Sequence, residues 1–375
     1  MTDSPTIWIN AGETSGDLHG QLLVRALRER RPDARFAGMA GPAMRREGVE
    51  PLLTTESLSV MGFTEVLAQL PRIMRLLRTI RERMEAMRPD VVVVIDAPDF
   101  HFRVVRIAKR LGIPVVYYIS PKLWAWRAGR AEFLRRHVDR LVCILPFEVD
   151  FYAGRGMTVD YVGHPLLDSI RTEDVLRTSP APRRIGILPG SRRREITGLL
   201  PIFSRAADLL AGRFPDLEFA LPVAPGMDRA LIAANWHSDL PITLVDSAGR
   251  YELMRSCRAI MAASGTATLE TALLGTPTAV AYTFSMPTYL LGRLLVKVPY
   301  MSLPNLILDA PVFPEFLQRG ATPAALAAAV AQWIPDTPQR AKMLAQLERL
   351  PDLLGSGGAA GRAADIVLNT MRKQS

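Results

Sequence analysis

The stretch Ala262-Ala-Ser-Gly-Thr-Ala-Thr-Leu-Glu270 reads as the end of an apolar strand, a tight glycine turn and the start of a helix. Gly265 lets the backbone turn closely, and the N–H groups from Thr266 onward open a helix whose dipole favours a phosphate. Glu270, one turn into that helix, can bond to the diol of a ribose. The stretch predicts a nucleotide diphosphate site, although many α/β connections contain a similar turn.

A second loop of this kind lies upstream, in Ile185-Gly-Ile-Leu-Pro-Gly-Ser-Arg-Arg-Arg-Glu195. A strand leads into Gly190 and Ser191, and the arginine run from Arg192 opens a long helix. Open α/β sheets bind ligands at the carboxyl ends of their strands, so we expect both loops at one edge of one sheet. The chain lacks a Walker-type lysine and a GxGxxG turn after its first strand, which disfavours ATP hydrolysis and ordinary dinucleotide binding.

Length and composition predict a globular protein of two domains. The 375 residues exceed one ordinary core, and 49% hydrophobic with 22% charged residues is typical of globular chains. No apolar run reaches the ~18 residues of a membrane span, and the start Met1-Thr-Asp-Ser-Pro5 is unlike a signal peptide, so we expect a cytoplasmic protein. The net charge of +9 predicts acidic partners, either phosphate-bearing substrates or an anionic membrane surface.

The cysteines and histidines show no metal-site pattern. Cys143 and Cys257 lack CxxC spacing and nearby histidines, so two small buried thiols are expected rather than a metal site or a disulfide. The five histidines are scattered along the chain, which also disfavours a metal: His19, His101, His137, His164 and His237.

Strands and helices alternate in two series. The first has strands at residues 6–11, 91–96, 115–119 and 140–145, and the second at 185–188, 218–222, 242–245, 259–263 and 278–282. The proline- and serine-containing segment 176–184 reads as the join. The prediction is an α/β protein with two Rossmann-like domains facing a cleft, residues 1–175 and 176–350, followed by a C-terminal helix in 351–375.

The first series carries its own candidate chemistry. In Ala11-Gly-Glu-Thr-Ser-Gly-Asp17 the two glycines allow close backbone approach, and Ser15 or Asp17 can alternatively cap the following helix. Asp96 ends the most buried predicted strand, where desolvation would raise its pKa toward that of a useful base. Asp99 is a rival carboxylate, although it can equally cap the next helix.

Seven short motifs follow one another over nearly the whole chain. They are Gly12-Glu-Thr-Ser-Gly-Asp17, Asp96-Ala-Pro-Asp99, Ser120-Pro-Lys-Leu-Trp-Ala-Trp126, Leu188-Pro-Gly-Ser-Arg192, Ala263-Ser-Gly-Thr-Ala267, Ser302-Leu-Pro-Asn305 and Pro314-Glu-Phe-Leu-Gln318. In this order they resemble the motifs of the lipid-A-disaccharide synthase family. Two of the motifs depart from the usual family pattern, since the first loop more often has alanine at Thr14 and Lys122-Leu123 differs from the commonest form.

The resemblance implies an inverting, metal-independent glycosyltransferase of the GT-B architecture. The family joins UDP-2,3-diacylglucosamine to 2,3-diacylglucosamine 1-phosphate, which gives the β-1,6-linked lipid A disaccharide 1-phosphate and UDP. No cofactor is implied, because UDP is the donor carrier and product, and no nucleic acid is expected as a partner. The domain 1–175 would take the acceptor and meet the membrane, and 176–350 would bind the UDP-sugar.

The resemblance also implies a role for each candidate residue. Asp96 would take the proton from the acceptor 6-hydroxyl, and Arg192 would neutralise charge on the departing UDP. Glu270 would hold the ribose, and Asn305 would lie near the diphosphate or donor sugar. The full set of expected substrate-binding residues is Glu13, Ser15, Gly16, Gly190, Ser191, Gly265, Thr266, Glu270 and Asn305.

The segment after Ser57 offers a place for acyl chains. Apolar residues recur at helical spacing and arginines lie on the other side, which favours a helix on the inner face of the cytoplasmic membrane. The alternative is a crossover helix that covers the sheet. The apolar residues are Phe63, Val66, Leu67, Leu70, Ile73, Met74 and Leu77, and the arginines are Arg72, Arg75, Arg78 and Arg81.

Two other function classes stay open. A UDP-sugar epimerase of the same architecture would also need the ribose carboxylate but not the apolar basic helix. A non-catalytic lipid or nucleotide carrier would have no use for Asp96. For the helix in 351–375, the resemblance implies a return to the N-terminal domain and exchange between the two subunits of a homodimer. A short helix that caps its own second domain is the alternative.

Overall fold

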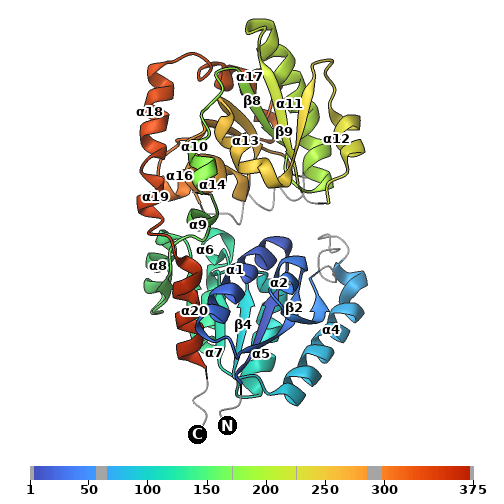
Figure 1. Cartoon of the computed structure of the whole chain (residues 1–375), viewed down its shortest axis with the longest axis vertical. Helices are drawn as coiled ribbons and strands as arrows, with labels where there is room; N and C mark the ends of the chain where they lie inside the picture. Colours follow the sequence, from blue (N-terminus) through green and yellow to red (C-terminus); the bar gives the residue numbers. More distant parts are fainter. Residues whose placement is uncertain (1–3, 56–65, 171, 225, 285–297, 372–375) are drawn as a thin grey trace. The chain divides into compact units, whose positions relative to one another are not determined.

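The computed structural model describes residues 4–55, 66–170, 172–224, 226–284 and 298–371, without the side chains of Thr14 and of residues 66–70. The chain forms two compact units, Met1–Pro165 with Gly355–Ser375, and Leu166–Leu354 (Figure 1). Each unit contains one parallel sheet with helices around it. The predicted pair of Rossmann-like domains is therefore confirmed.

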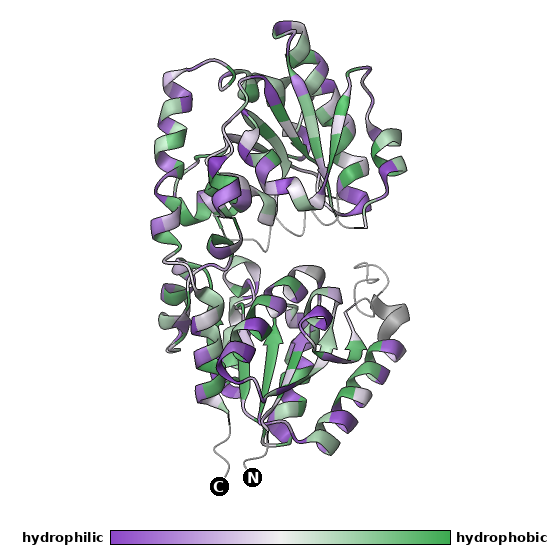
Figure 2. Ribbon diagram, in the orientation of Figure 1, coloured by the Kyte–Doolittle hydropathy of each residue, from purple (hydrophilic) through white to green (hydrophobic). Residues whose placement is uncertain are grey.

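The first sheet has seven strands in the order β3-β2-β1-β4-β5-β6-β7. The inner strand β4 is buried along its whole length, as its valine run predicts for a sheet covered on both faces. Figure 2 shows the hydrophobic residues of the sheet in green. The strands are β1 Thr6–Ala11, β2 Arg35–Ala40, β3 Glu50–Thr54, β4 Val91–Ile95, β5 Val115–Tyr118, β6 Arg140–Cys143 and β7 Asp160–Tyr161. The helices are α1 Thr14–Arg30, α2 Pro42–Arg46, α4 Val66–Met87, α5 Pro98–Arg110, α6 Leu123–Trp126, α7 Ala131–His137 and α8 Pro146–Ala153.

The second sheet has six strands in the order β10-β9-β8-β11-β12-β13. Its strands are β8 Arg184–Leu188, β9 Glu218–Val223, β10 Ile242–Asp246, β11 Ala259–Ala263, β12 Thr278–Tyr282 and β13 Glu315–Leu317. Its unit also holds α9 Leu166–Ile170, α10 Glu173–Arg177, α11 Arg193–Arg213, α12 Arg229–Asn235, α13 Arg250–Ser256, α14 Thr266–Leu273, α16 Leu303–Leu308, α17 Pro323–Ala331, α18 Pro338–Leu347 and α19 Leu350–Leu353.

Each predicted strand is present, with small differences at the ends. Strand β4 stops before Asp96 and β5 stops before Ile119, because these residues take φ angles of 49° and 63°. Strand β6 ends at Cys143, since the next two N–H groups, of Ile144 and Leu145, bond to the side chain of Glu148. Strands β2, β3, β7 and β13 are not among the predicted ones.

The C-terminal helix α20, Ala359–Thr370, packs on α1 and on strands β4 to β6 of the first unit (Figure 1). It buries Ala359, Ala363, Ala364 and Val367. The Arg362 guanidinium donates two hydrogen bonds to the Val162 carbonyl, at 2.7 and 3.0 Å. The predicted return of this segment to the N-terminal domain is confirmed, and the alternative of a cap on the second domain is wrong.

Ending the chain after Leu354 removes this helix, and we expect the melting temperature to fall by at least about 5 °C. The first unit loses a buried apolar face, and each kcal/mol lost lowers Tm by about 2–4 °C in a chain of this size. Calorimetry checks the result. The control ends after Met371, beyond α20, and should melt like the full chain. An unchanged Tm in the shorter variant would contradict this account of the helix.

Candidate functional site

The strand order reverses between β1 and β4 in the first sheet and between β8 and β11 in the second. Ala11 pairs with Ile95, and Leu188 pairs with Ala262, so the loops that follow leave from adjacent strand ends. Crevices at such reversals are where open α/β sheets bind ligands. The structure thus gathers the predicted residues at two places: the Gly12 loop with Asp96 in the first unit, and the Gly190 loop with the Gly265 loop in the second.

Asp96 lies at the first reversal and is half-buried. Burial raises the pKa of its carboxyl group, while the nearby charge of Lys122 lowers the pKa and that of Glu13 raises it. A carboxylate whose pKa is moved upward toward neutrality is a better general base than an exposed one. These electrostatics fit the role predicted for Asp96.

Asp99, the rival carboxylate, has a different environment. Its Oδ1 accepts hydrogen bonds from Arg127 at 2.7 Å and Arg130 at 2.6 Å. Burial acts to raise the Asp99 pKa, but these two arginines outweigh it and lower the pKa. A carboxylate held ionised by two guanidinium groups is a weak proton acceptor. The geometry therefore favours Asp96 over Asp99 as the base.

The first glycine loop exposes Glu13 and Ser15 and buries Gly16. Helix α1 begins without a side-chain cap, so the alternative that Ser15 or Asp17 caps this helix is wrong. Asp17 instead accepts hydrogen bonds from three backbone N–H groups around the start of α2, those of Gly41, Ala43 and Met44. Binding by Glu13, Ser15 and Gly16 stays a prediction.

Two histidines of the first unit, His19 and His164, interact through their charges although they lie far apart in the sequence. Burial lowers the pKa of His19 to about 4 and that of His164 to about 3. The charges of His19 and Lys122 lower the His164 pKa further, so these three groups interact electrostatically. Sequence spacing gave no signal for this grouping, because only the fold brings the start of α1, the end of β5 and the end of β7 together.

In the second unit the Gly190 loop already holds an anion, its own Glu195. The Glu195 carboxylate accepts hydrogen bonds from the N–H groups of Ser191 at 3.0 Å and Arg192 at 3.2 Å. Gly190, at φ 101°, has no room for a side chain, because a Cβ would lie 2.2 Å from that carboxylate. The Arg192 side chain is 71% exposed and stays 4.0 Å from Glu195. The predicted roles of Gly190, Ser191 and Arg192 stay predictions.

The Gly265 loop is open. Gly265 and Thr266 are exposed, and a Cβ added to Gly265 would meet no atom within 4 Å. Glu270, in the same helix, is half-buried, and its Oε1 accepts a 3.2 Å hydrogen bond from the Tyr251 hydroxyl. That hydroxyl accepts a 2.7 Å bond from Arg250. Burial raises the Glu270 pKa, and Arg250 and Tyr251 counteract the rise.

The open space at Gly265 supports a sharp test of ligand binding. We expect Gly265→Ala to leave Tm unchanged and to weaken UDP binding about tenfold, roughly 1.4 kcal/mol, because the new methyl group meets ligand rather than protein. Titration calorimetry measures the affinity. The control is Gly212→Ala near the end of α11, where a Cβ also meets nothing within 4 Å, and it should bind UDP normally. Equal affinities in both variants would contradict a ligand role for Gly265.

Asn305 has a structural role in this structure. Its side chain is 1% exposed and exchanges two 2.8 Å hydrogen bonds with the backbone of Phe313. Its Nδ2 also donates to Glu315, which accepts from Ser302 as well. The amide therefore fastens α16 to the segment before β13. A contact between Asn305 and substrate stays a prediction.

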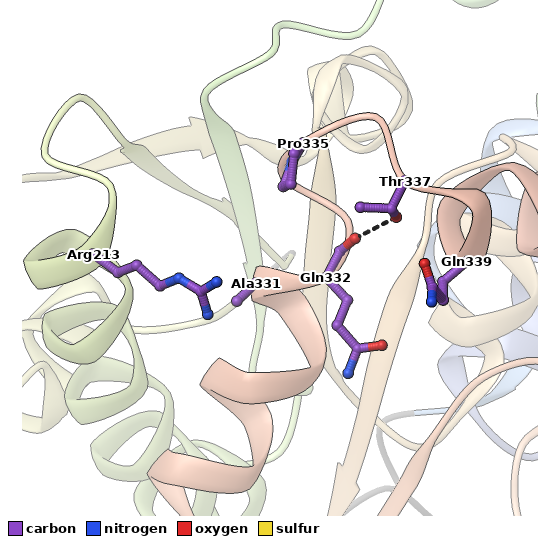
Figure 3. Close-up of a pocket in the computed structure, with 6 residues that line it drawn as sticks. All are labelled: Arg213, Ala331, Gln332, Pro335, Thr337 and Gln339. Carbon is purple, nitrogen blue, oxygen red and sulfur yellow. Dashed lines mark hydrogen bonds between the residues drawn. The ribbon is translucent and has the colours of Figure 1, made fainter.

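Each unit has a surface cavity of about 250 Å³. The first contains Arg213, at the end of α11 opposite to the Arg192 loop (Figure 3). The second lies between α5 and α7 and contains Asp99. Neither includes a residue of the predicted site. The linings are Arg213, Ala331, Gln332, Pro335, Thr337 and Gln339, and Pro98, Asp99, Phe102, Arg103, Arg106, Arg130 and Phe133.

Residues 7–357 match the family described as lipid-A-disaccharide synthetase. The chain belongs to the lipid-A-disaccharide synthase family. The lipid-A-disaccharide synthase of Myxococcus xanthus is 42% identical over 99% of this chain and 99% of its own length. That of Geobacter sulfurreducens is 40% identical over the full length of both. The chain is thus a glycosyltransferase of lipid A biosynthesis, with lipid A precursors as substrates.

Solved structures support the fold. The glycotransferase of kitacinnamycin matches with a TM-score of 0.67 and 18% identity, over 98% of this chain and 100% of that chain. A UDP-GlcNAc 2-epimerase from Neisseria meningitidis matches with a TM-score of 0.65 and 13% identity, over 98% and 99%. The GT-B fold predicted for this family is confirmed. Among the residues described, no helix is long and apolar enough to cross a membrane.

Proposed function

We propose that this enzyme joins UDP-2,3-diacylglucosamine to 2,3-diacylglucosamine 1-phosphate, giving the β-1,6-linked disaccharide 1-phosphate and UDP. The observation that carries the proposal is the extent of the family match. Residues 7–357 include every residue proposed here for catalysis and binding, from Glu13 to Asn305. The UDP-GlcNAc 2-epimerase of similar fold shares only 13% of its residues with this chain, against 42% for the synthase of Myxococcus xanthus.

In the proposed mechanism Asp96 accepts the proton of the acceptor 6-hydroxyl. The hydroxyl oxygen then forms the new bond to the donor's anomeric carbon as the bond from that carbon to UDP breaks. The released electron pair stays on the diphosphate, where Arg192 and the Gly265 loop stabilise it. Glu270 holds the ribose of the donor. Because one displacement occurs at the anomeric carbon, its configuration inverts.

A UDP-sugar epimerase is the second candidate, favoured by the likeness in fold to UDP-GlcNAc 2-epimerases. Mass spectrometry of the products distinguishes the two functions. The proposed enzyme forms a disaccharide monophosphate and UDP only when both substrates are present. An epimerase would convert the UDP-sugar without acceptor, and a carrier would convert neither substrate. Either of these two outcomes would refute the proposed reaction.

We also propose that α4 rests on the anionic inner face of the cytoplasmic membrane. Its second half packs into the core through Leu77, Ile80 and Met84, as expected of a crossover helix. Met74 is 60% exposed between the exposed Arg72 and Arg75. Phe63 and the side chains of Val66, Leu67 and Leu70 lie outside the described residues. Sedimentation with phosphatidylglycerol vesicles, but not with phosphatidylcholine vesicles, would support this contact, and its absence from both would refute it.

Exchange of α20 between two subunits is the remaining part of the proposal. The linker Gly355-Ser-Gly-Gly358 supports it, because both Gly355 and Gly358 have positive φ and can redirect the chain. Light scattering tests it: a dimer that becomes monomeric on truncation after Leu354 supports exchange, and a monomeric full chain refutes it.

A further inference from the structure

The turn after β4 has an unusual backbone. Asp96 and Ala97 both have left-handed conformations, with φ angles of 49° and 45°. L side chains rarely adopt this conformation, so two such residues in succession persist only where the surrounding structure holds them. This strained turn carries the carboxylate proposed as the base.

Two side chains from different elements form hydrogen bonds to the same backbone oxygen of this turn. The Asp96 carbonyl oxygen is 2.7 Å from the Tyr117 hydroxyl of β5 and 2.7 Å from Nδ1 of His101 in α5. Because a carbonyl only accepts hydrogen bonds, His101 carries its proton on Nδ1. Burial lowers the His101 pKa to about 4 and raises that of Tyr117 well above its usual value. Both groups are therefore neutral donors at physiological pH.

The first glycine loop packs closely against the same turn. A Cβ added to Gly12 would lie 2.4 Å from the Ala97 Cβ and 3.6 Å from Cε1 of His101. The Ala97 carbonyl in turn accepts hydrogen bonds from the N–H groups of Phe100 and His101, at 3.2 and 3.0 Å. Residues of three elements, β5, α5 and the loop after β1, thus contact Asp96 or Ala97.

We propose that Tyr117 and His101 are positioning residues for catalysis, which hold the Asp96 backbone left-handed and thereby fix the orientation of its carboxylate. The inference rests on the proposed role of Asp96 as the base. A single donor would satisfy the Asp96 carbonyl. A second donor, on a separate element, fixes the direction of the peptide group as well, and catalytic carboxylates need such fixed geometry.

The test begins with Tyr117→Phe, which keeps the buried ring and removes one hydrogen bond. We expect kcat to fall about tenfold, while the KM of both substrates and the affinity for UDP stay unchanged. The control is Tyr152→Phe, which removes another buried hydroxyl of the same unit, 3.0 Å from Ser120 Oγ, without touching Asp96. It should keep kcat. An unchanged kcat in Tyr117→Phe, or an equal loss in the control, would overturn the proposal.

His101 provides a rescue experiment. Asparagine can place an N–H near the position of Nδ1, whereas leucine cannot, so His101→Asn should keep most of kcat and His101→Leu should lose about tenfold or more. Each variant's folding is checked by its Tm and UDP affinity. Equal losses of kcat in both variants would indicate packing rather than hydrogen bonding, and would contradict the proposal for His101.

The same substitutions in an Asp96→Asn background separate the positioning role from the base assignment. If Tyr117 acts through the carboxylate, Tyr117→Phe should have no further effect on the low residual turnover of Asp96→Asn. A further tenfold loss there would overturn the positioning role and leave the base assignment standing. Near-normal turnover of Asp96→Asn by itself would instead refute Asp96 as the base, and the proposal with it.

Discussion

Asp96→Asn is expected to lower kcat by at least ~10²-fold and to leave UDP affinity unchanged. Asparagine keeps the size of the side chain but cannot accept the proton of the acceptor hydroxyl. It also tolerates the left-handed backbone at this position, where φ is 49°, so the turn should survive. Steady-state kinetics and titration calorimetry with UDP measure the two quantities.

The matched control is Asp99→Asn, three residues along the chain. Asp99 is paired with two arginines, so its substitution should affect kcat less than that of Asp96. If Asp99→Asn is the more damaging change, the base assignment moves to Asp99. Loss of UDP binding in Asp96→Asn would mean that Asp96 organises the fold.

The kcat of the wild-type enzyme should also depend on pH. Burial raises the pKa of Asp96 above the usual aspartate range. We expect kcat to fall as the pH drops through this pKa, because the protonated acid cannot accept a proton.

Arg192→Ala is expected to lower kcat about 10²-fold, roughly 3 kcal/mol, in a protein of unchanged Tm. Groups that stabilise charge developing in a transition state have effects of this size. The side chain is 71% exposed, so its removal leaves no cavity. Thermal unfolding confirms that the variant is folded, and steady-state kinetics with both substrates measures kcat.

The neighbouring Arg194 provides the control for Arg192. It belongs to the same arginine run and is also exposed, and its substitution by alanine removes the same charge from the surface. Arg194→Ala should therefore keep kcat. Equal losses in the two variants would mean that only the general positive field of the loop matters, and would reject a specific role for Arg192.

Strands with continuous β-branched or apolar runs could be predicted, because burial on both faces requires such sequences. Val91–Ile95 is the clearest case. Strand β2 gives no such signal: Gly38 interrupts it, and a Cβ there would lie 2.1 Å from the Ile9 carbonyl oxygen. Its close approach to β1 is a tertiary feature that no local pattern in the sequence carries.

The features of the candidate site also differ in whether the local sequence predicts them. The glycine loops were predictable because a strand, a glycine and a helix follow one another locally. The hydrogen bond from the Arg192 N–H to Glu195 has a local signal too, since an acidic residue three positions after the N-cap residue of a helix is typical of such a cap. Tyr117 and His101 had none, since only the pairing of β4 with β5 and the course of α5 bring them to Asp96.

The most direct test of the central claim is the configuration of the new glycosidic bond, measured by NMR on the disaccharide that the purified enzyme forms. A base that activates the acceptor for one displacement predicts inversion, and hence a β-linkage to the 6-hydroxyl. An α-linked product would mean retention, which requires two displacements and a nucleophile on the enzyme. That result would contradict the role proposed for Asp96.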